Sequence, residues 1–160
     1  MASINVYEMK KVKYRQEEDY FQGDLYYKGE YIGNITRDDG EQIVTVDQGK
    51  LEKFKEICLD VIGFLDDEEL ETVQNPFDCF LAELINLNIL EERYKQCVKE
   101  GSNVLYVFHL ENGSSMLLSD NSKNPEETAE LMVEEIFNKN KELPAVESFE
   151  VFDSIEKFYI

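Results

Sequence analysis

The chain is poor in the residue types that most often carry catalysis, metal binding or disulfide bonds. Its 160 residues include one histidine, three cysteines and no tryptophan. A single imidazole leaves little material for acid–base chemistry. The cysteines, Cys58, Cys79 and Cys97, each adjoin Phe, Ile, Leu or Val, which predicts reduced, buried thiols. Neither a Gly-rich phosphate loop nor a metal-binding Cys or His pair occurs. We therefore expect no enzymatic activity, no cofactor and no metal.

Long apolar runs are also missing. None approaches the length of a membrane span, and residues 1–5 (MASIN) lack the charged-then-apolar order of a secretion signal. These two absences, together with the reduced cysteines, predict a cytoplasmic protein that does not enter a membrane.

Basic residues are scarce relative to acidic ones. Sixteen Lys and Arg stand against 35 Asp and Glu, which gives a formal charge of −19. Such a field repels nucleic acid and anionic lipid, so we expect no direct binding to either. The chain is nevertheless 42% apolar, with nine Tyr and ten Phe. That content is enough to bury a core, so the charge does not indicate disorder.

The negative charge is concentrated in the later part of the chain. Residues 1–60 carry 9 basic and 13 acidic side chains, whereas residues 61–160 carry 7 basic and 22 acidic ones. An asymmetry of this kind favours a charged interaction surface, although an evenly solvated acidic face would look the same in sequence.

The first part of the chain predicts an antiparallel sheet followed by a helix. Alternating and β-branched residues up to Val46 indicate four strands, separated by turns at Lys28-Gly29 and Asp38-Asp39-Gly40. From Leu51 to Leu65 the apolar period becomes helical, and this helix is expected to lie across the sheet. Residues 1–65 would form one lobe, and the acidic segment 66–76 would connect it to the next.

The second lobe is predicted to span residues 77–160. We expect two helices interrupted at 86–88, a β-hairpin, a third helix and a terminal extended segment. The supporting signals are an Asn88/Glu91 capping box, Gly101 at a helix end, the Asn112-Gly113 turn, and Asn124 as the cap of a helix that begins at Pro125. The fold class is therefore α+β, with the two lobes forming one compact unit.

The helix expected over residues 125–139 is the main candidate for a binding surface. One side gathers Ala129, Met132, Val133, Ile136 and Phe137. The other side carries the acidic residues Glu126, Glu127, Glu130, Glu134 and Glu135, with Leu131 among them. The helix dipole favours acids in the first turn only. The acids further along, around an apolar Leu131, favour a contact surface for a basic protein.

A second acidic run, Asp66, Asp67, Glu68, Glu69 and Glu71, is assigned to the same contact surface. It lacks the alternating oxygen ligands and the glycine of a calcium loop, so no metal is expected there. Glu111 and Asp120, beside the predicted hairpin, are weaker candidates for partner contact.

The first third of the chain resembles small proteins of phages and mobile elements from low-GC Gram-positive bacteria. The resemblance lies in segment 7–13 (YEMKKVK), the run 21–35 (FQGDLYYKGEYIGNI) with its Y-x-x-G-x-x-I-G pattern, and Asp39-Gly40 before a helix. Small acidic proteins of this kind resemble inhibitors of host defence, above all the anti-CRISPR proteins directed at type II RNA-guided nucleases. The resemblance implies action in the bacterial host cell by occupation of a surface, without catalytic residues.

The expected function is therefore non-enzymatic inhibition of a basic bacterial protein, namely a CRISPR-associated DNA nuclease. One alternative is a DNA mimic that inhibits a restriction enzyme, or an immunity protein for a nuclease toxin. Another is a structural or assembly protein of a phage or mobile element, whose acidity serves solubility alone. An undetected carboxylate enzyme would need a deep pocket that holds two acids with His109 or a tyrosine. The oligomeric state is not predicted.

Overall fold

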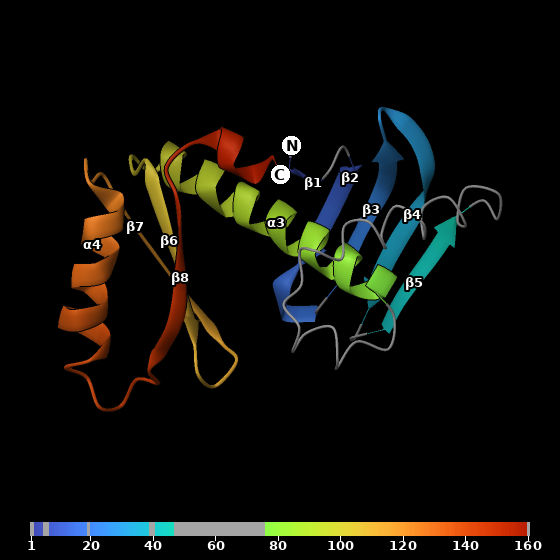
Figure 1. Cartoon of the computed structure of the whole chain (residues 1–160). Helices are drawn as coiled ribbons and strands as arrows, with labels where there is room; N and C mark the ends of the chain where they lie inside the picture. The colour runs from blue at the N-terminus through green and yellow to red at the C-terminus, as the bar shows by residue number, and fades with distance from the viewer. Residues whose placement is uncertain (1, 5–6, 19, 39–40, 47–75, 160) are drawn as a thin grey trace. The chain divides into compact units, whose positions relative to one another are not determined.

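The computed structural model describes residues 2–4, 7–18, 20–38, 41–46 and 76–159, and these form an α+β fold (Figure 1). The predicted helix at 51–65 and the acidic run at 66–71 lie outside the described residues. The chain divides into two compact units, residues 1–90 with 158–160, and residues 91–157. The division falls inside a helix, whereas the sequence placed it at the 66–76 connector.

The first unit contains a five-stranded antiparallel meander in the order β1-β2-β3-β4-β5. Its strands are β1 (Ser3–Ile4), β2 (Tyr7–Arg15), β3 (Tyr20–Tyr27), β4 (Glu30–Asp38) and β5 (Glu41–Val46), with a short 3-10 turn η1 (Gln16–Glu18) between β2 and β3. The predicted turn at Lys28-Gly29 is confirmed, because both residues have positive φ values of 47° and 79°. Such values suit the two-residue hairpins that match strand twist.

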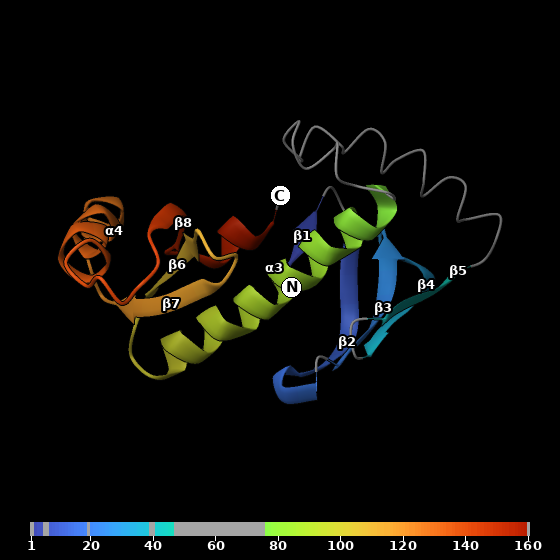
Figure 2. The ribbon, with the colours of Figure 1, turned by 90° about the horizontal axis from the view of Figure 1, so that it is seen from below.

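Helix α3 (Pro76–Lys99) supplies the helical layer of the first unit. Its N-terminal half crosses one face of the meander (Figure 2). Leu84, Ile85 and Leu87 are buried there, as are Phe21 and Leu25 on β3. Apolar side chains at alternate strand positions and at helical spacing thereby share one core.

The predicted interruption of this helix at 86–88 is wrong, because α3 runs without a break from residue 76 to residue 99. The Asn88 side chain is buried and donates a hydrogen bond to the Leu84 carbonyl at 2.8 Å, so its amide is satisfied inside the helix. Burial of the neighbouring leucines and isoleucine stabilises the helical conformation more than an asparagine disfavours it.

The end of α3 follows the prediction. Gly101 has a φ of +97°, Ser102 N–H donates to the Cys97 carbonyl at 2.9 Å, and Gly101 N–H donates to Val98 at 3.1 Å. This pair of bonds is a Schellman cap, which requires the left-handed conformation that glycine adopts without strain. Cys97 itself is only partly buried, so the prediction of a buried thiol fails at this cysteine.

The second unit contains a three-stranded antiparallel sheet in the order β7-β6-β8. The elements are β6 (Val104–Leu110), β7 (Ser115–Asp120), α4 (Pro125–Met132), the π-helical turn η3 (Val133–Phe137), β8 (Val146–Phe152) and η4 (Ile155–Phe158), whose last residue belongs to the first unit. Helix α4 packs on one face of this sheet (Figure 1). Tyr106, Phe108, Ala129 and Phe137 form the buried centre of the layer between them.

Candidate functional site

Helix α4 begins where the sequence predicted, but its first turn is held differently. Pro125 occupies the first turn, and the Asn124 carbonyl accepts the Thr128 N–H at 3.0 Å. The Asn124 side chain makes no capping bond, so the predicted asparagine cap is wrong. Instead, Ser122 organises the entry: its hydroxyl accepts the Asn124 N–H at 3.1 Å and lies 2.6 Å from the Thr128 hydroxyl.

The predicted helix does not stay α-helical to residue 139. Over η3 it widens to a π-turn, in which the Asn138 N–H donates to the Val133 carbonyl at 2.9 Å. A π-turn inserts one extra residue and shifts the side chains that follow. Phe137 is buried, as predicted, whereas Ile136, predicted for the same side, is 38% exposed.

The acidic side of α4 and η3 is exposed to solvent. Leu131 is 52% exposed and sits among the carboxylates, as the helical spacing predicted. The exposed acids are Glu126, Glu127, Glu130, Glu134 and Glu135. Glu135 pairs with Lys139 at 2.7 Å, which the sequence analysis overlooked. Within the described part of the chain, the other four carboxylates have no ion pair, so their charge is available to a partner.

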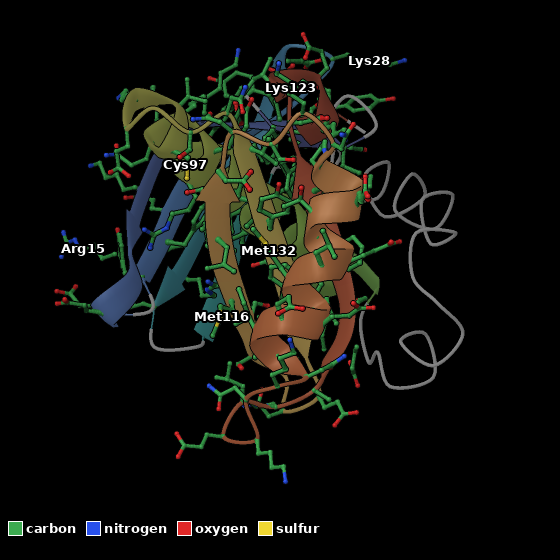
Figure 3. All side chains as sticks on the ribbon, turned by 90° about the vertical axis from the view of Figure 1, so that its left-hand side faces the viewer. Arg15, Lys28, Cys97, Met116, Lys123 and Met132 are labelled. Atoms are coloured by element: carbon green, nitrogen blue, oxygen red, sulfur yellow. The ribbon has the colours of Figure 1, made fainter. Side chains whose placement is uncertain are left out.

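A hollow of about 600 Å³ lies between this acidic side and strand β8. Its lining combines an apolar floor with carboxylates and two neutral polar side chains. The residues are Val133, Val146, Phe149, Glu130, Glu134, Glu147, Asn138 and Ser148. We call this hollow the α4–β8 groove. Figure 3 looks onto α4, with Met132 of α4 and Met116 of β7 packed against the core between helix and sheet.

The α4–β8 groove changes the site that the sequence predicted. It includes Glu130 and Glu134 but adds Glu147, which sequence reasoning missed because it lies on a separate strand. The only signal for Glu147 was the mixture of acidic and apolar residues in the terminal extended segment. Carboxylates around an apolar floor can bind a cationic side chain while its methylene groups, or a neighbouring apolar residue, cover the floor.

The weaker candidate Asp120 has a structural role. Its Oδ1 accepts the hydroxyl of the buried Tyr106 at 2.7 Å and the Ser122 N–H at 3.0 Å. Burial, together with the hydrogen bond and the charge of Asp120, raises the pKa of Tyr106 to about 12. Asp120 is therefore committed to the fold, whereas Glu111 is exposed at the hairpin turn.

The single histidine takes part in a network across all three strands of the second sheet. His109 Nδ1 lies 3.2 Å from Ser115 Oγ, and its Nε2 lies 2.8 Å from Glu150 Oε2. These are the residue types of a serine-hydrolase triad, but none of the three lines the α4–β8 groove. Among the described residues, the α4–β8 groove is lined by three acids but by neither His109 nor a tyrosine, so it lacks the arrangement that a carboxylate enzyme would need.

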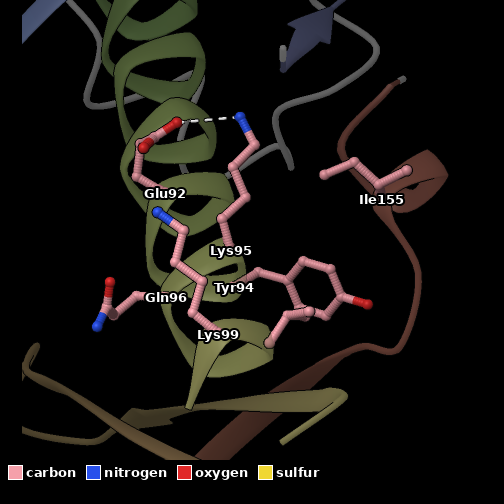
Figure 4. A pocket seen from close by; sticks show the side chains of 7 residues that line it. Glu92, Tyr94, Lys95, Gln96, Lys99 and Ile155 are labelled. Atoms are coloured by element: carbon pink, nitrogen blue, oxygen red, sulfur yellow. Dashed lines mark hydrogen bonds and ion pairs between the residues drawn. The ribbon is translucent and has the colours of Figure 1, made fainter. Parts of the chain in front are cut away.

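A second hollow of about 600 Å³ borders the last turns of α3 (Figure 4). Tyr94, Val98 and Ile155 supply its apolar lining, beside Lys95 and Lys99, with Glu92 and Gln96 completing it. Lys95 pairs with Glu91 at 3.0 Å and with Glu92 at 3.1 Å. Two carboxylates therefore already neutralise one of the two lysines that line this hollow.

Comparison of the chain with known protein families, with curated proteins and with solved structures found no match. In the part of the chain described above, no three His, Cys, Asp or Glu side chains gather in a way that could hold a metal ion. Nor does any described helix have the length and apolarity needed to cross a membrane.

Proposed function

We propose that this protein is a non-enzymatic inhibitor that binds a basic bacterial protein through the α4–β8 groove, and that its target is an RNA-guided DNA nuclease. Nuclease channels that hold nucleic acid are lined by Lys and Arg. A folded body with a charge of −19 would be steered toward such a channel. The resemblance to anti-CRISPR proteins supports the same target class.

The observation that carries this proposal is the combination of three carboxylates with an apolar floor in one concavity. A DNA mimic would instead need carboxylates spaced like phosphates along one extended face. Glu130, Glu134 and Glu147 surround Val133, Val146 and Phe149, which fits a specific basic and apolar protein surface. The acids would raise the association rate, and the apolar contacts, with the exposed Leu131 beside them, would slow dissociation.

The test is binding to a purified type II nuclease loaded with its guide RNA, together with the rate of target DNA cleavage. The variant Glu130→Gln/Glu134→Gln/Glu147→Gln removes the rim charge of the groove with almost no change of shape. We expect its affinity to fall about tenfold or more, because three surface charge contacts of roughly 0.5 kcal/mol each are lost. We also expect the wild-type affinity to weaken as ionic strength rises.

The matched control, Glu17→Gln/Glu142→Gln/Glu156→Gln, removes the same charge from exposed sites outside the groove. It should retain most of the affinity. Equal weakening by both triple variants would contradict the groove as the contact. Failure of the wild-type chain to bind the nuclease or to slow cleavage would contradict the target class, and a structural protein would give that result.

A further inference from the structure

We infer that the α4–β8 groove takes an extended basic segment of the partner, which pairs with the outer edge of β8 as a fourth strand of the second sheet. The inference rests on the proposed function, and it specifies the form of the partner segment and the backbone groups that hold it. Three observations support it: the position of β8 in the sheet, the direction of its peptide groups, and the charges beside them.

Strand β8 lies at one edge of the sheet, next to β6 (Figure 1). Among the described residues, no strand pairs with its other side. An edge strand presents N–H and C=O groups that can hydrogen bond to an incoming chain. The groove lies beside this strand, because its lining includes four consecutive residues of β8: Val146, Glu147, Ser148 and Phe149.

The hydrogen bonds show which β8 residues face outward. The Leu110 N–H donates to the Ser114 carbonyl at 2.9 Å, on the β7 side. Backbone N–H and C=O groups alternate in direction along an antiparallel strand, so those of Val107 and His109 point toward β8. The backbone groups of their register partners, Glu150 and Ser148, therefore point inward to β6. The backbone N–H and C=O groups of Phe149 and Val151, which alternate with these two residues along β8, point outward.

A side-chain contact supports this assignment independently. Lys157 Nζ donates a hydrogen bond to the Val151 carbonyl at 3.3 Å. That carbonyl therefore faces away from β6, and Lys157 already occupies it. The backbone N–H groups of Phe149 and Val151 and the Phe149 carbonyl form the edge that an added strand would use.

The charges beside this edge decide what kind of strand it accepts. Glu147 is exposed on β8, and Glu130 and Glu134 face the groove from α4 and η3, whereas the Glu150 carboxylate lies 2.8 Å from His109 Nε2. Charged residues on an edge strand normally prevent pairing between identical chains. A second copy of this protein would bring the same carboxylates together. In an added strand, apolar side chains on the face toward α4 would cover Val133 and Phe149. The long Lys or Arg side chains that alternate with them would extend past the strand to the acids at the rim of the groove.

The experiment follows hydrogen exchange of the individual backbone amides of the full chain, without and with a saturating blocked peptide of alternating lysine and valine. We expect exchange at Phe149 and Val151 to slow about tenfold or more, since each amide gains a hydrogen bond. The amides of Ser148 and Glu150, which already pair with β6, should change little. A peptide methylated on alternate backbone nitrogens should bind at least about tenfold more weakly.

The outcomes separate this inference from the proposed function. If the nuclease binds through the groove but the peptide leaves amide exchange at Phe149 and Val151 unchanged, strand addition is overturned and the proposed function stands. Slowed exchange with the peptide, without binding of the nuclease, supports strand addition and contradicts the nuclease as target. Peptide binding that slows exchange only in α4, or that tolerates backbone methylation, overturns the inference in favour of a helix-face contact.

Discussion

Replacement of Phe108 by alanine is expected to lower the free energy of unfolding of the second unit by about 3–5 kcal/mol. Phe108 is fully buried in the centre of β6. Its ring lies 4.9 Å from the Phe137 ring of η3, 6.1 Å from the Phe149 ring of β8 and 6.3 Å from the Tyr106 ring. Alanine would leave a cavity where helix and sheet meet, and the apolar contacts of three other aromatic rings would be lost with it.

Urea unfolding, followed by circular dichroism and by exchange of the β6 amides, measures this change. The control is Leu131→Ala, at a side chain that is half exposed, and it should change stability by less than about 0.5 kcal/mol. A loss below about 1 kcal/mol for Phe108→Ala would contradict the assignment of Phe108 to the centre of the core.

The second large effect is a loss of stability at alkaline pH caused by Tyr106. Burial first, and then the Asp120 carboxylate, raise the pKa of this phenol from 10 to about 12. The folded state therefore holds the proton more tightly than the unfolded state. The resulting stabilisation is fully present below pH 10 and is lost as the pH rises from about 10 to 12. Its size is about 2 to 3 kcal/mol, given 1.36 kcal/mol per pKa unit.

The measurement compares urea unfolding of the wild type and of Tyr106→Phe between neutral pH and about pH 12. The stability difference between the two proteins should shrink across that range, because phenylalanine has no proton to lose. The control variant Tyr31→Phe changes an exposed tyrosine and should keep the wild-type pH dependence. Parallel pH profiles for wild type and Tyr106→Phe would contradict the prediction.

Local signals in the sequence predicted much of the fold. The turn at Lys28-Gly29, the helix end at Gly101 and the helix start at Pro125 are all present in the structure. Each of these depends on the conformational limits of one or two residues, which do not depend on distant contacts. The alternating and continuous apolar runs likewise predicted strands β2 to β8, because each run reports directly on which face of a strand is buried.

Errors arose where burial outweighed local preference. Asn88 was read as a helix cap, but it sits inside α3 because its amide bonds to the Leu84 carbonyl and its neighbours are buried. The helical spacing places both Ile136 and Phe137 on the buried side, but only Phe137 is buried, whereas Ile136, inside the π-turn, is 38% exposed. No helical wheel anticipates a π-turn, since the wheel assumes one constant period.

The sequence predicted the helical side of the candidate site but not the side that β8 supplies. The sequence indicates Glu130, Leu131 and Glu134, because the helix dipole favours acids only in the first turn and these residues lie beyond it. Glu147 and Phe149 complete the groove from β8, and their approach to α4 depends on the register of β8 against β6. Register and helix placement are long-range properties, so no local pattern contained them.

By itself, the sequence determined the α+β class, the scarcity of catalytic side chains, the acidic charge and the exposed helical side that carries Leu131. These follow from composition and from periodicity, which are properties of residues close together in the chain. Only the tertiary structure decided that Asp120 accepts a hydrogen bond from Tyr106, that His109 joins Ser115 to Glu150, and that a groove lies beside strand β8. Those outcomes require residues far apart in the chain to meet, and the packing of α4 on the β7-β6-β8 sheet brings them together.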